Sequence, residues 1–229
     1  ATFNAPLAGV MFALEVLLAQ FELIQFTSVV VSAVIASVIG HAYFGDAPAF
    51  AFPQSPSPTA WELSVYGMLG IFAASVGVGF NRSLHWVTAL FREWAIPSYV
   101  KPALGGLLVG SVGLWFPEIF GVGYGSIEAA LFGRLTIASL LVLGLLKLVA
   151  TSITIGSGGS GGIFGPSLFL GAMLGGVFGQ LVHTGTPEDP FSSAYVLVGM
   201  SAVFGAVSHA PITAILTLFE MTRDYNAML

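Results

Sequence analysis

The sequence has no cysteine and very few charged side chains, and each absence excludes a class of protein. Without cysteine there is no disulfide scaffold and no thiolate metal site, and we expect neither a metal nor a cofactor. Only six Lys and Arg residues oppose eleven Asp and Glu, for a net charge of −5. So few cations cannot form a basic patch, so we expect no nucleic-acid partner.

Apolar residues are what the sequence has in excess. Hydrophobic residues make up 56% of the chain and charged residues 7%, whereas a soluble domain has about 25% charged residues. The mean hydropathy is +0.93. A soluble domain would need a charged surface that this composition cannot supply. We therefore predict a multi-pass integral membrane protein, with the lipid bilayer as its surroundings.

The apolar residues fall into segments separated by Gly, Pro and polar clusters, which predict helices at 4–20, 24–42, 61–80, 83–97, 101–116, 135–155, 166–183, 191–208 and 210–222. A span needs about 20 residues, so the shorter segments predict tilted or re-entrant helices. The proline-rich stretch 45–60 predicts an aqueous loop. We expect one all-α membrane domain, 1–229. Because its start has neither Met nor a basic region, we expect a piece of a longer chain.

Glycines at a spacing of four residues predict close helix contacts. Gly171, Gly175 and Gly179 form a double stripe of this kind, and Gly106 with Gly110 forms a single one. Such stripes let two helix backbones approach each other inside a membrane. We interpret both as packing features, not as sites.

Two distant stretches repeat one pattern. "NAPLAGVMFALEV" at 4–16 aligns without gaps with "HAPITAILTLFEM" at 209–221, and the alignment pairs Pro6 with Pro211 and Glu15 with Glu220. Both copies have a polar residue in a capping position and then a first-turn proline. In the second copy the polar residue is His209, which we expect to cap or to pack and not to bind a metal. Transporters are often built from repeats inverted in the membrane, with the substrate site between them. We therefore predict that the two prolines begin helices that run in opposite directions.

The stretch "GSGGSGGIFGP" at 156–166 interrupts an apolar region. Its glycines satisfy G-x-G-x-x-G, but no soluble strand precedes them and no acidic residue lies between Lys147 and Glu188 to bind a ribose hydroxyl. No Lys-Ser/Thr pair follows, which excludes a P-loop. The glycines instead predict a break in the span, and Pro166 predicts the first turn of a new helix.

A helix that starts inside the bilayer can attract an anion. The first amides, around Ile163 and Phe164, have no partner within the helix, and the helix dipole adds about half a positive charge there. Partial charges replace the hydration of the ion and still allow its release. The alternative is a break that only packs against a neighbour.

Four separated stretches make the sequence similar to one family. "GSGGSGGIFGPSLFLGAMLGG" resembles the G-x-F-x-P signature of the CLC family of chloride channels and chloride/proton antiporters. "FNAPLAGVMFALE", "GVGYGSIE" and "SHAPITAILTLFEMT" resemble other elements of that family, in order. The resemblance implies a CLC-type core of inverted repeats, comprising the end of the first half and most of the second. Three family features lie outside the sequence, namely the G-S-G-I-P loop, the G-R-E-G-P loop and a late tyrosine, so we expect the pore to be incomplete.

The resemblance also implies site residues. The amides of Ile163 and Phe164, with Gly162 before them, are expected to bind the central anion. Glu15 matches an acidic position, and proton handling there competes with a helix-end role shared with Glu220. The next residue, where proton-coupled members often have a glutamate, is Val16, and valine cannot relay a proton. Lys147 is expected either to raise the anion potential of a vestibule or to bind backbone carbonyls.

These observations predict chloride transport without enzymatic activity, and they favour channel-like conduction. A proton-coupled antiporter is the alternative. A secondary transporter of another small anion or a membrane scaffold fits less well, because the break lacks fixed Arg side chains and a scaffold needs no open helix terminus. The family further implies a homodimer, and we expect the plasma membrane of a prokaryote.

Overall fold

The computed structural model describes residues 5–18, 23–45, 60–182 and 190–222, and this part of the chain contains helices and no strand. The helices are α1 (Pro6–Phe12), the π-helix η1 (Ala13–Leu18), α2 (Leu23–Phe44), α3 (Ala60–Glu93), α4 (Lys101–Gly113), the 3-10 helix η2 (Pro117–Ile119), α5 (Tyr124–Leu131), α6 (Ile137–Gly156), α7 (Phe164–Val182), α8 (Pro190–Ser208) and α9 (Pro211–Thr222). The predicted all-α class is confirmed. The predicted loop 45–60 lies almost entirely outside the described residues.

Four of the described helices, α2, α3, α6 and α7, are long and apolar enough to cross a membrane. The apolar stretches Pro6–Leu18, Ser193–Ser208 and Pro211–Thr222 are shorter. A helix that ends within the bilayer must place its terminal amides or carbonyls against protein or water. This requirement applies to the short segments, since a full span needs about 20 residues.

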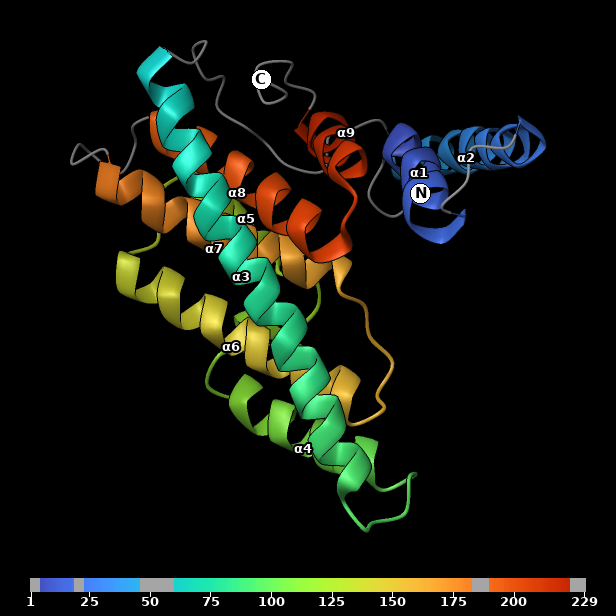
Figure 1. The fold of residues 1–229 in the computed structure, drawn as a ribbon, viewed down its shortest axis with the longest axis vertical. Helices are drawn as coiled ribbons and strands as arrows, with labels where there is room; N and C mark the ends of the chain where they lie inside the picture. Colours follow the sequence, from blue (N-terminus) through green and yellow to red (C-terminus); the bar gives the residue numbers. More distant parts are fainter. Residues whose placement is uncertain (1–4, 19–22, 46–59, 183–189, 223–229) are drawn as a thin grey trace.

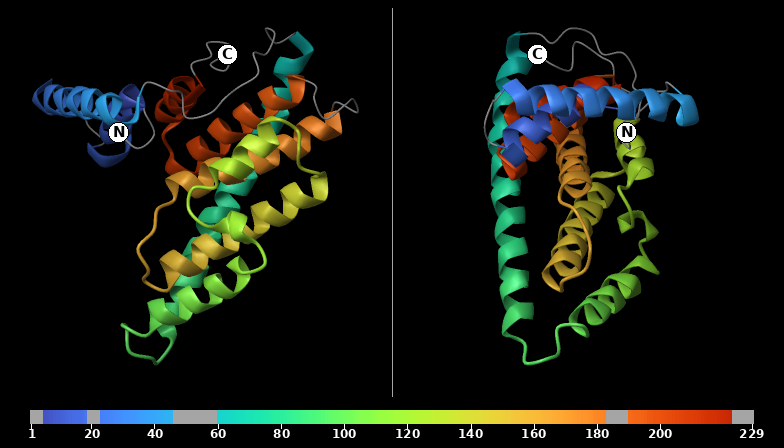
Figure 2. Two further views of the ribbon diagram at one scale, coloured as in Figure 1. Left: turned by 180° about the vertical axis from the view of Figure 1, so that it is seen from behind. Right: turned by 90° about the vertical axis from the view of Figure 1, so that its right-hand side faces the viewer.

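The helices form three layers (Figures 1 and 2). The long helix α3 lies on one side, α6, α7 and α8 lie in the middle, and α4 and α5 lie on the other side. One apolar core joins α5, α6, α7, α8 and α9, and a second joins α3 to α7 and α8. Helix α2 extends away from these layers, and none of its apolar window is buried.

Glycine brings α7 and α8 into direct backbone contact, as the stripe predicts. A Cβ atom at Gly171 would overlap the carbonyl oxygen of Gly199, and one at Gly175 would overlap that of Tyr195. The packing role of Gly106 and Gly110 stays a prediction, because a Cβ atom at either position would meet no described atom within 4 Å. Their spacing is also compatible with a helix face that packs against nothing in the described chain.

Helix α3 corrects a predicted boundary. The segments 61–80 and 83–97 belong to one helix that continues to Glu93, through the polar residues between them. Two of these side chains have partners on neighbouring helices: the Asn81 amide donates to the Val207 carbonyl over 3.3 Å, and the hydroxyls of Ser83 and Ser152 are 3.0 Å apart. Polar residues with such partners do not need a loop.

Candidate anion-binding site

The chain turns sharply where α6 ends. The amide of Gly158 donates to the Ile155 carbonyl over 3.0 Å, and the amide of Gly159 donates to the Thr154 carbonyl over 2.9 Å. Gly158 has a φ angle of 90°, a left-handed conformation that glycine adopts without strain. These bonds satisfy carbonyls at the end of α6, as in other glycine-terminated helices. The glycines therefore end one helix before the next begins, which confirms the predicted break.

Helix α7 begins at Phe164. The Ile163 carbonyl accepts the first helical bond, from the Ser167 amide at 2.9 Å, so Ile163 is the N-cap residue and Pro166 lies in the first turn as predicted. Among the backbone bonds recorded for the described residues, none has the Ile163 amide as its donor. The first turn contains no acidic residue that would neutralise the dipole.

The approach to this terminus is open in the described chain. Gly161 and Gly162 are exposed, and the Ile163 side chain is 37% exposed. A Cβ atom at Gly162 would meet no described atom within 4 Å. Gly162 and Ile163 are thus exposed and Phe164 is partly buried, and all three lie at the positive end of a helix that is more than half buried in its apolar window.

Aromatic contacts hold the first residue of α7. The Phe164 ring lies 6.3 Å from the Phe12 ring of α1 and 4.7 Å from the Phe204 ring of α8, both in edge-to-face geometry. Such pairs prefer this arrangement over face-to-face stacking. The site therefore depends on α1 and α8 as well as on its own loop.

Lys147 lies in α6 with 2% of its surface exposed. Its ammonium donates to the carbonyls of Ile119 and Gly121, at 2.8 and 2.6 Å, and lies 5.0 Å from the ring centroid of Phe169. These are the contacts expected of the carbonyl-binding alternative. An effect of this charge on an approaching anion stays a prediction.

The repeated glutamates cap helix ends. Glu15, in η1, accepts from the amides of Ile212 and Thr213 at 3.4 and 2.9 Å and from the Thr213 hydroxyl at 2.7 Å. Glu220, in α9, accepts from the amides of Leu7 and Ala8 at 2.9 and 2.7 Å. The shared helix-end role is confirmed, whereas proton handling by Glu15 stays a prediction.

These bonds also fix the direction of the two helices. Each carboxylate lies near the end of its own segment and binds the start of the other, so α1 and α9 run in opposite directions, as predicted. Of the two roles expected for His209, capping is wrong and packing stays a prediction. Ala210 is the N-cap of α9, since its carbonyl accepts from the Ala214 amide over 3.0 Å, and His209 precedes it with a φ angle of 56°. Asn4, the predicted cap of the first copy, lies outside the described residues.

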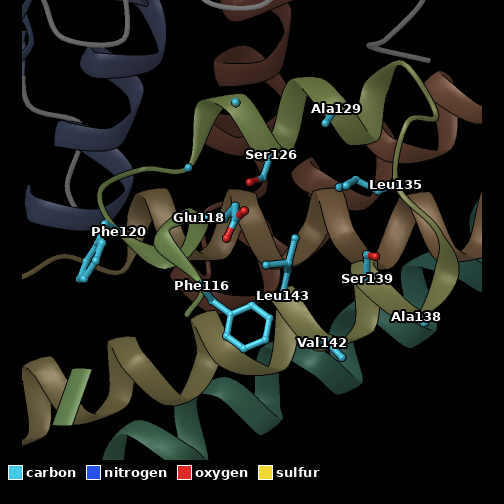
Figure 3. Close-up of a pocket in the computed structure, with 12 residues that line it drawn as sticks. Phe116, Glu118, Phe120, Ser126, Ala129, Leu135, Ala138, Ser139, Val142 and Leu143 are labelled. Atoms are coloured by element: carbon cyan, nitrogen blue, oxygen red, sulfur yellow. The ribbon is translucent and has the colours of Figure 1, made fainter. Parts of the chain in front are cut away.

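A cavity of about 740 Å³ lies elsewhere, between η2, α5 and α6 (Figure 3). Glu118 and Ser126 point into it, and its walls are otherwise mainly apolar. The residues that line it are Phe116, Glu118, Phe120, Gly123, Gly125, Ser126, Ala129, Leu135, Ala138, Ser139, Val142 and Leu143. Because the predicted anion-binding residues are not among them, this cavity is separate from the candidate site.

Sequence reasoning missed residues that contact the capping glutamate Glu15 or the first residue of α7. Thr213 donates twice to Glu15, and the rings of Phe12 and Phe204 contact Phe164. Thr213 could have been found from the sequence, because it is a polar residue two positions after the first-turn proline, where the other copy has Ala8. The aromatic contacts carry none, since nothing in the sequence distinguishes these rings from other apolar residues.

Together the four long apolar helices, the inverted helix pair and the broken apolar segment are features of an integral membrane protein. The family described as "Voltage gated chloride channel" matches residues 1–229, so the chain belongs to that family.

Relatives and solved structures agree with this assignment. The chain is 35% identical over 248 residues to chloride channel protein CLC-f of Arabidopsis thaliana, covering 99% of the chain and 32% of the relative. It is 33% identical to the H(+)/Cl(-) exchange transporter ClcA of Vibrio parahaemolyticus, covering 100% and 50%. Its fold is similar to that of a slow cyanobacterial Cl-/H+ antiporter, with a TM-score of 0.84 and 27% identity, covering 99% and 54%. The chain thus spans about half the length of the relatives ClcA and the antiporter.

Proposed function

We propose that the protein carries chloride across a membrane and that the start of α7 holds the anion on its way. In this proposal the amides of Ile163 and Phe164 face the ion, and Gly162 leaves room for it to approach the backbone. The supporting observation is an apolar, largely buried helix whose exposed N-terminal approach has glycines and whose first turn has no carboxylate. Partial charges of this kind bind an anion weakly enough for release.

We further propose that conduction is channel-like. Val16 follows Glu15 at a position where a glutamate would support proton transfer, and its side chain cannot exchange protons. The antiporter is the second candidate, because both the Vibrio relative and the cyanobacterial structure are described as chloride/proton exchangers. A homodimer and a prokaryotic plasma membrane remain part of the proposal, as the family resemblance implies them.

Flux measurements separate the two candidates. The protein at its full natural length would be reconstituted in liposomes with a chloride gradient, while external chloride and internal pH are recorded together. Channel-like conduction predicts chloride efflux without accompanying proton movement and a reversal potential that follows the chloride gradient alone. A reversal potential that shifts with the pH gradient would replace the channel by the antiporter. No chloride flux in either form would reject the proposal as a whole.

Binding measurements test the site itself. A ligand that binds only the folded protein stabilises it in proportion to the logarithm of its concentration above the dissociation constant. Chloride should therefore raise the melting temperature of the purified protein, and gluconate, which is a much larger anion than chloride, should do so less. Equal effects of the two anions at matched ionic strength would contradict a specific site.

A further inference from the structure

The starts of α1 and α9 cap each other: each helix start donates its amides to a glutamate of the other segment. Glu15 binds the second and third residues of α9, which are Ile212 and Thr213, and Glu220 binds the second and third residues of α1. The partners lie 197 and 198 residues apart in one direction and 213 and 212 in the other. The repeat alignment pairs the two glutamates, so the arrangement has approximate twofold symmetry.

Neither helix supplies its own cap. The residue at the N-cap position is Ala5 in α1 and Ala210 in α9, and an alanine side chain cannot accept a hydrogen bond. The amides at each start therefore rely on a carboxylate from the other helix. Bonds from amides to a carboxylate are charge-assisted and stronger than neutral ones. The two exchanges together hold α1 and α9 at two points, one at each end of the pair.

The helix pair reaches the candidate anion site through one layer of rings. Phe12 of α1 contacts Phe164, the first residue of α7, at 6.3 Å between ring centroids. On the other side Phe204 of α8 contacts Phe164 at 4.7 Å, and Phe204 shares its apolar core with Ala214 and Leu218 of α9. A displacement of either helix thus reaches Phe164 through packed side chains, which do not deform continuously.

We propose that Glu15 and Glu220 form a reciprocal latch that positions Phe164 and, through it, the anion-binding start of α7. The two glutamates are positioning residues and do not touch the anion. This inference rests on the proposed function where chloride affinity is measured. The latch also predicts an effect on the loop 156–163, which precedes Phe164, and the conformation of that loop can be measured without chloride.

The affinity test replaces each carboxylate by an amide of nearly the same shape. In Glu15→Gln and Glu220→Gln, one end of the side chain becomes a donor and faces a backbone donor, so the latch opens on that side. Chloride binding to the full-length protein in detergent, measured by calorimetry, should weaken by about threefold to tenfold in each variant. The fold-loss in chloride affinity of the double variant should be smaller than the product of the two single fold-losses. The reason is that both glutamates hold the same interface, between α1 and α9.

The matched control is Glu128→Gln. Glu128 is an exposed residue of α5, so this variant removes the same charge without opening a helix cap. Loss of negative charge alone would strengthen chloride binding in all three variants, and that result would overturn the latch. Unchanged affinity together with a lowered melting temperature would also overturn it, because the glutamates would then be structural only.

A labelling experiment reads the loop directly. The sequence has no cysteine, so Ser160→Cys places one thiol on the exposed part of the loop, with any cysteine elsewhere in the full-length protein replaced. The rate of modification by a water-soluble thiol reagent should change by at least about threefold in both latch variants and stay constant in the control, since it follows the population of loop conformations. Unchanged rates in both latch variants would overturn the latch.

The two readouts keep the proposals apart. If the unaltered protein binds no chloride but both latch variants change the labelling rate, the anion site is rejected and the latch stands. If the protein binds chloride and neither readout responds, the latch alone is rejected. Should the Gln variants fail to fold, Thr213→Val removes only the hydroxyl bond to Glu15, and we expect a smaller change in the same direction in both readouts.

Discussion

Three helix starts in this protein face the same electrostatic problem and meet it in two ways. At α1 and α9, carboxylates of Glu220 and Glu15 occupy the first amides. At α7, exposed glycines precede the helix and its first turn has no acidic residue. Since each start carries about half a positive charge, the first two are neutralised by the chain while the third can attract an external anion. The contrast separates a structural helix start from a candidate binding site.

Moving a carboxylate to α7 is the strongest way to break this contrast. Ile163→Asp would place an acidic N-cap at the candidate site, so that α7 resembles α1 and α9. A full charge about 4 Å from the ion repels it by about 4 kcal/mol at a dielectric constant of 20, so chloride affinity should fall at least about tenfold. Calorimetric titration with chloride would measure this.

The neutral N-cap variant Ile163→Asn serves as its control, because asparagine caps a helix about as well as aspartate does. We expect Ile163→Asn to retain more of the affinity than Ile163→Asp. Similar losses in the two variants would mean that the side chain, and not its charge, obstructs the site.

Removing a carboxylate tests the other half of the contrast. Glu15→Ala and Glu220→Ala should each lower the free energy of unfolding by about 2 kcal/mol, because amides at a helix start lose their acceptors. Glu15 should have the larger effect, since it accepts three bonds and Glu220 two. Thermal unfolding in detergent measures both, with Glu128→Ala as the exposed control. If added chloride fully restored the lost stability, the starts of α1 and α9 would bind anions as well, and the contrast with α7 would be wrong.

Lys147 provides the converse case, a cation bound to carbonyls. Lys147→Met keeps the length of the side chain but leaves the carbonyls of Ile119 and Gly121 without their donor. We expect a loss of about 1 to 3 kcal/mol in the free energy of unfolding. Lys101→Met is the matched control, since the Lys101 ammonium makes one exposed bond of 3.4 Å. If Lys147→Met and Lys101→Met lowered the free energy of unfolding equally, the buried contacts of Lys147 would contribute no stability of their own.

The smallest effect concerns the turn before α9. His209 has a φ angle of 56°, and left-handed backbone is unfavourable for residues other than glycine. His209→Gly should therefore raise the free energy of unfolding by about 0.5 kcal/mol, after allowing for the greater freedom of glycine in the unfolded chain. Ser208→Gly, inside the end of α8, should lower it instead. A destabilising His209→Gly would indicate a contact of the imidazole that the backbone angle does not reveal.

The sequence was sufficient for the features that depend on local chemistry. Glycines and Pro166 predict the break and the first turn of α7, because their backbone preferences act at the positions where they occur. The aligned Pro6 and Pro211 predict two equivalent helix starts, and the inverted arrangement follows from the precedent of membrane repeats. All of these predictions agree with the described structure.

The features that were missed depend on contacts between distant residues. The polar stretch at 81–83 is consistent with a loop until Asn81 and Ser83 meet partners on α8 and α6. Gly106 and Gly110 have the spacing of a contact stripe, but spacing does not specify which helix face has a neighbour. Likewise His209 is a polar residue before a helix, as an N-cap is. The tertiary structure shows that Glu15, from the other segment, accepts from the first amides of α9 instead.

The exchange of caps has a consequence for the order of folding. The ribosome makes Leu7 and Ala8 long before Glu220, which is 213 residues further along from Leu7. Until then the first amides of α1 must be hydrated or bound to something else, because an orphan amide in hydrocarbon is unfavourable by several kcal/mol. The start of α1 therefore reaches its final state only after α9 has been synthesised, although α1 itself is made long before α9.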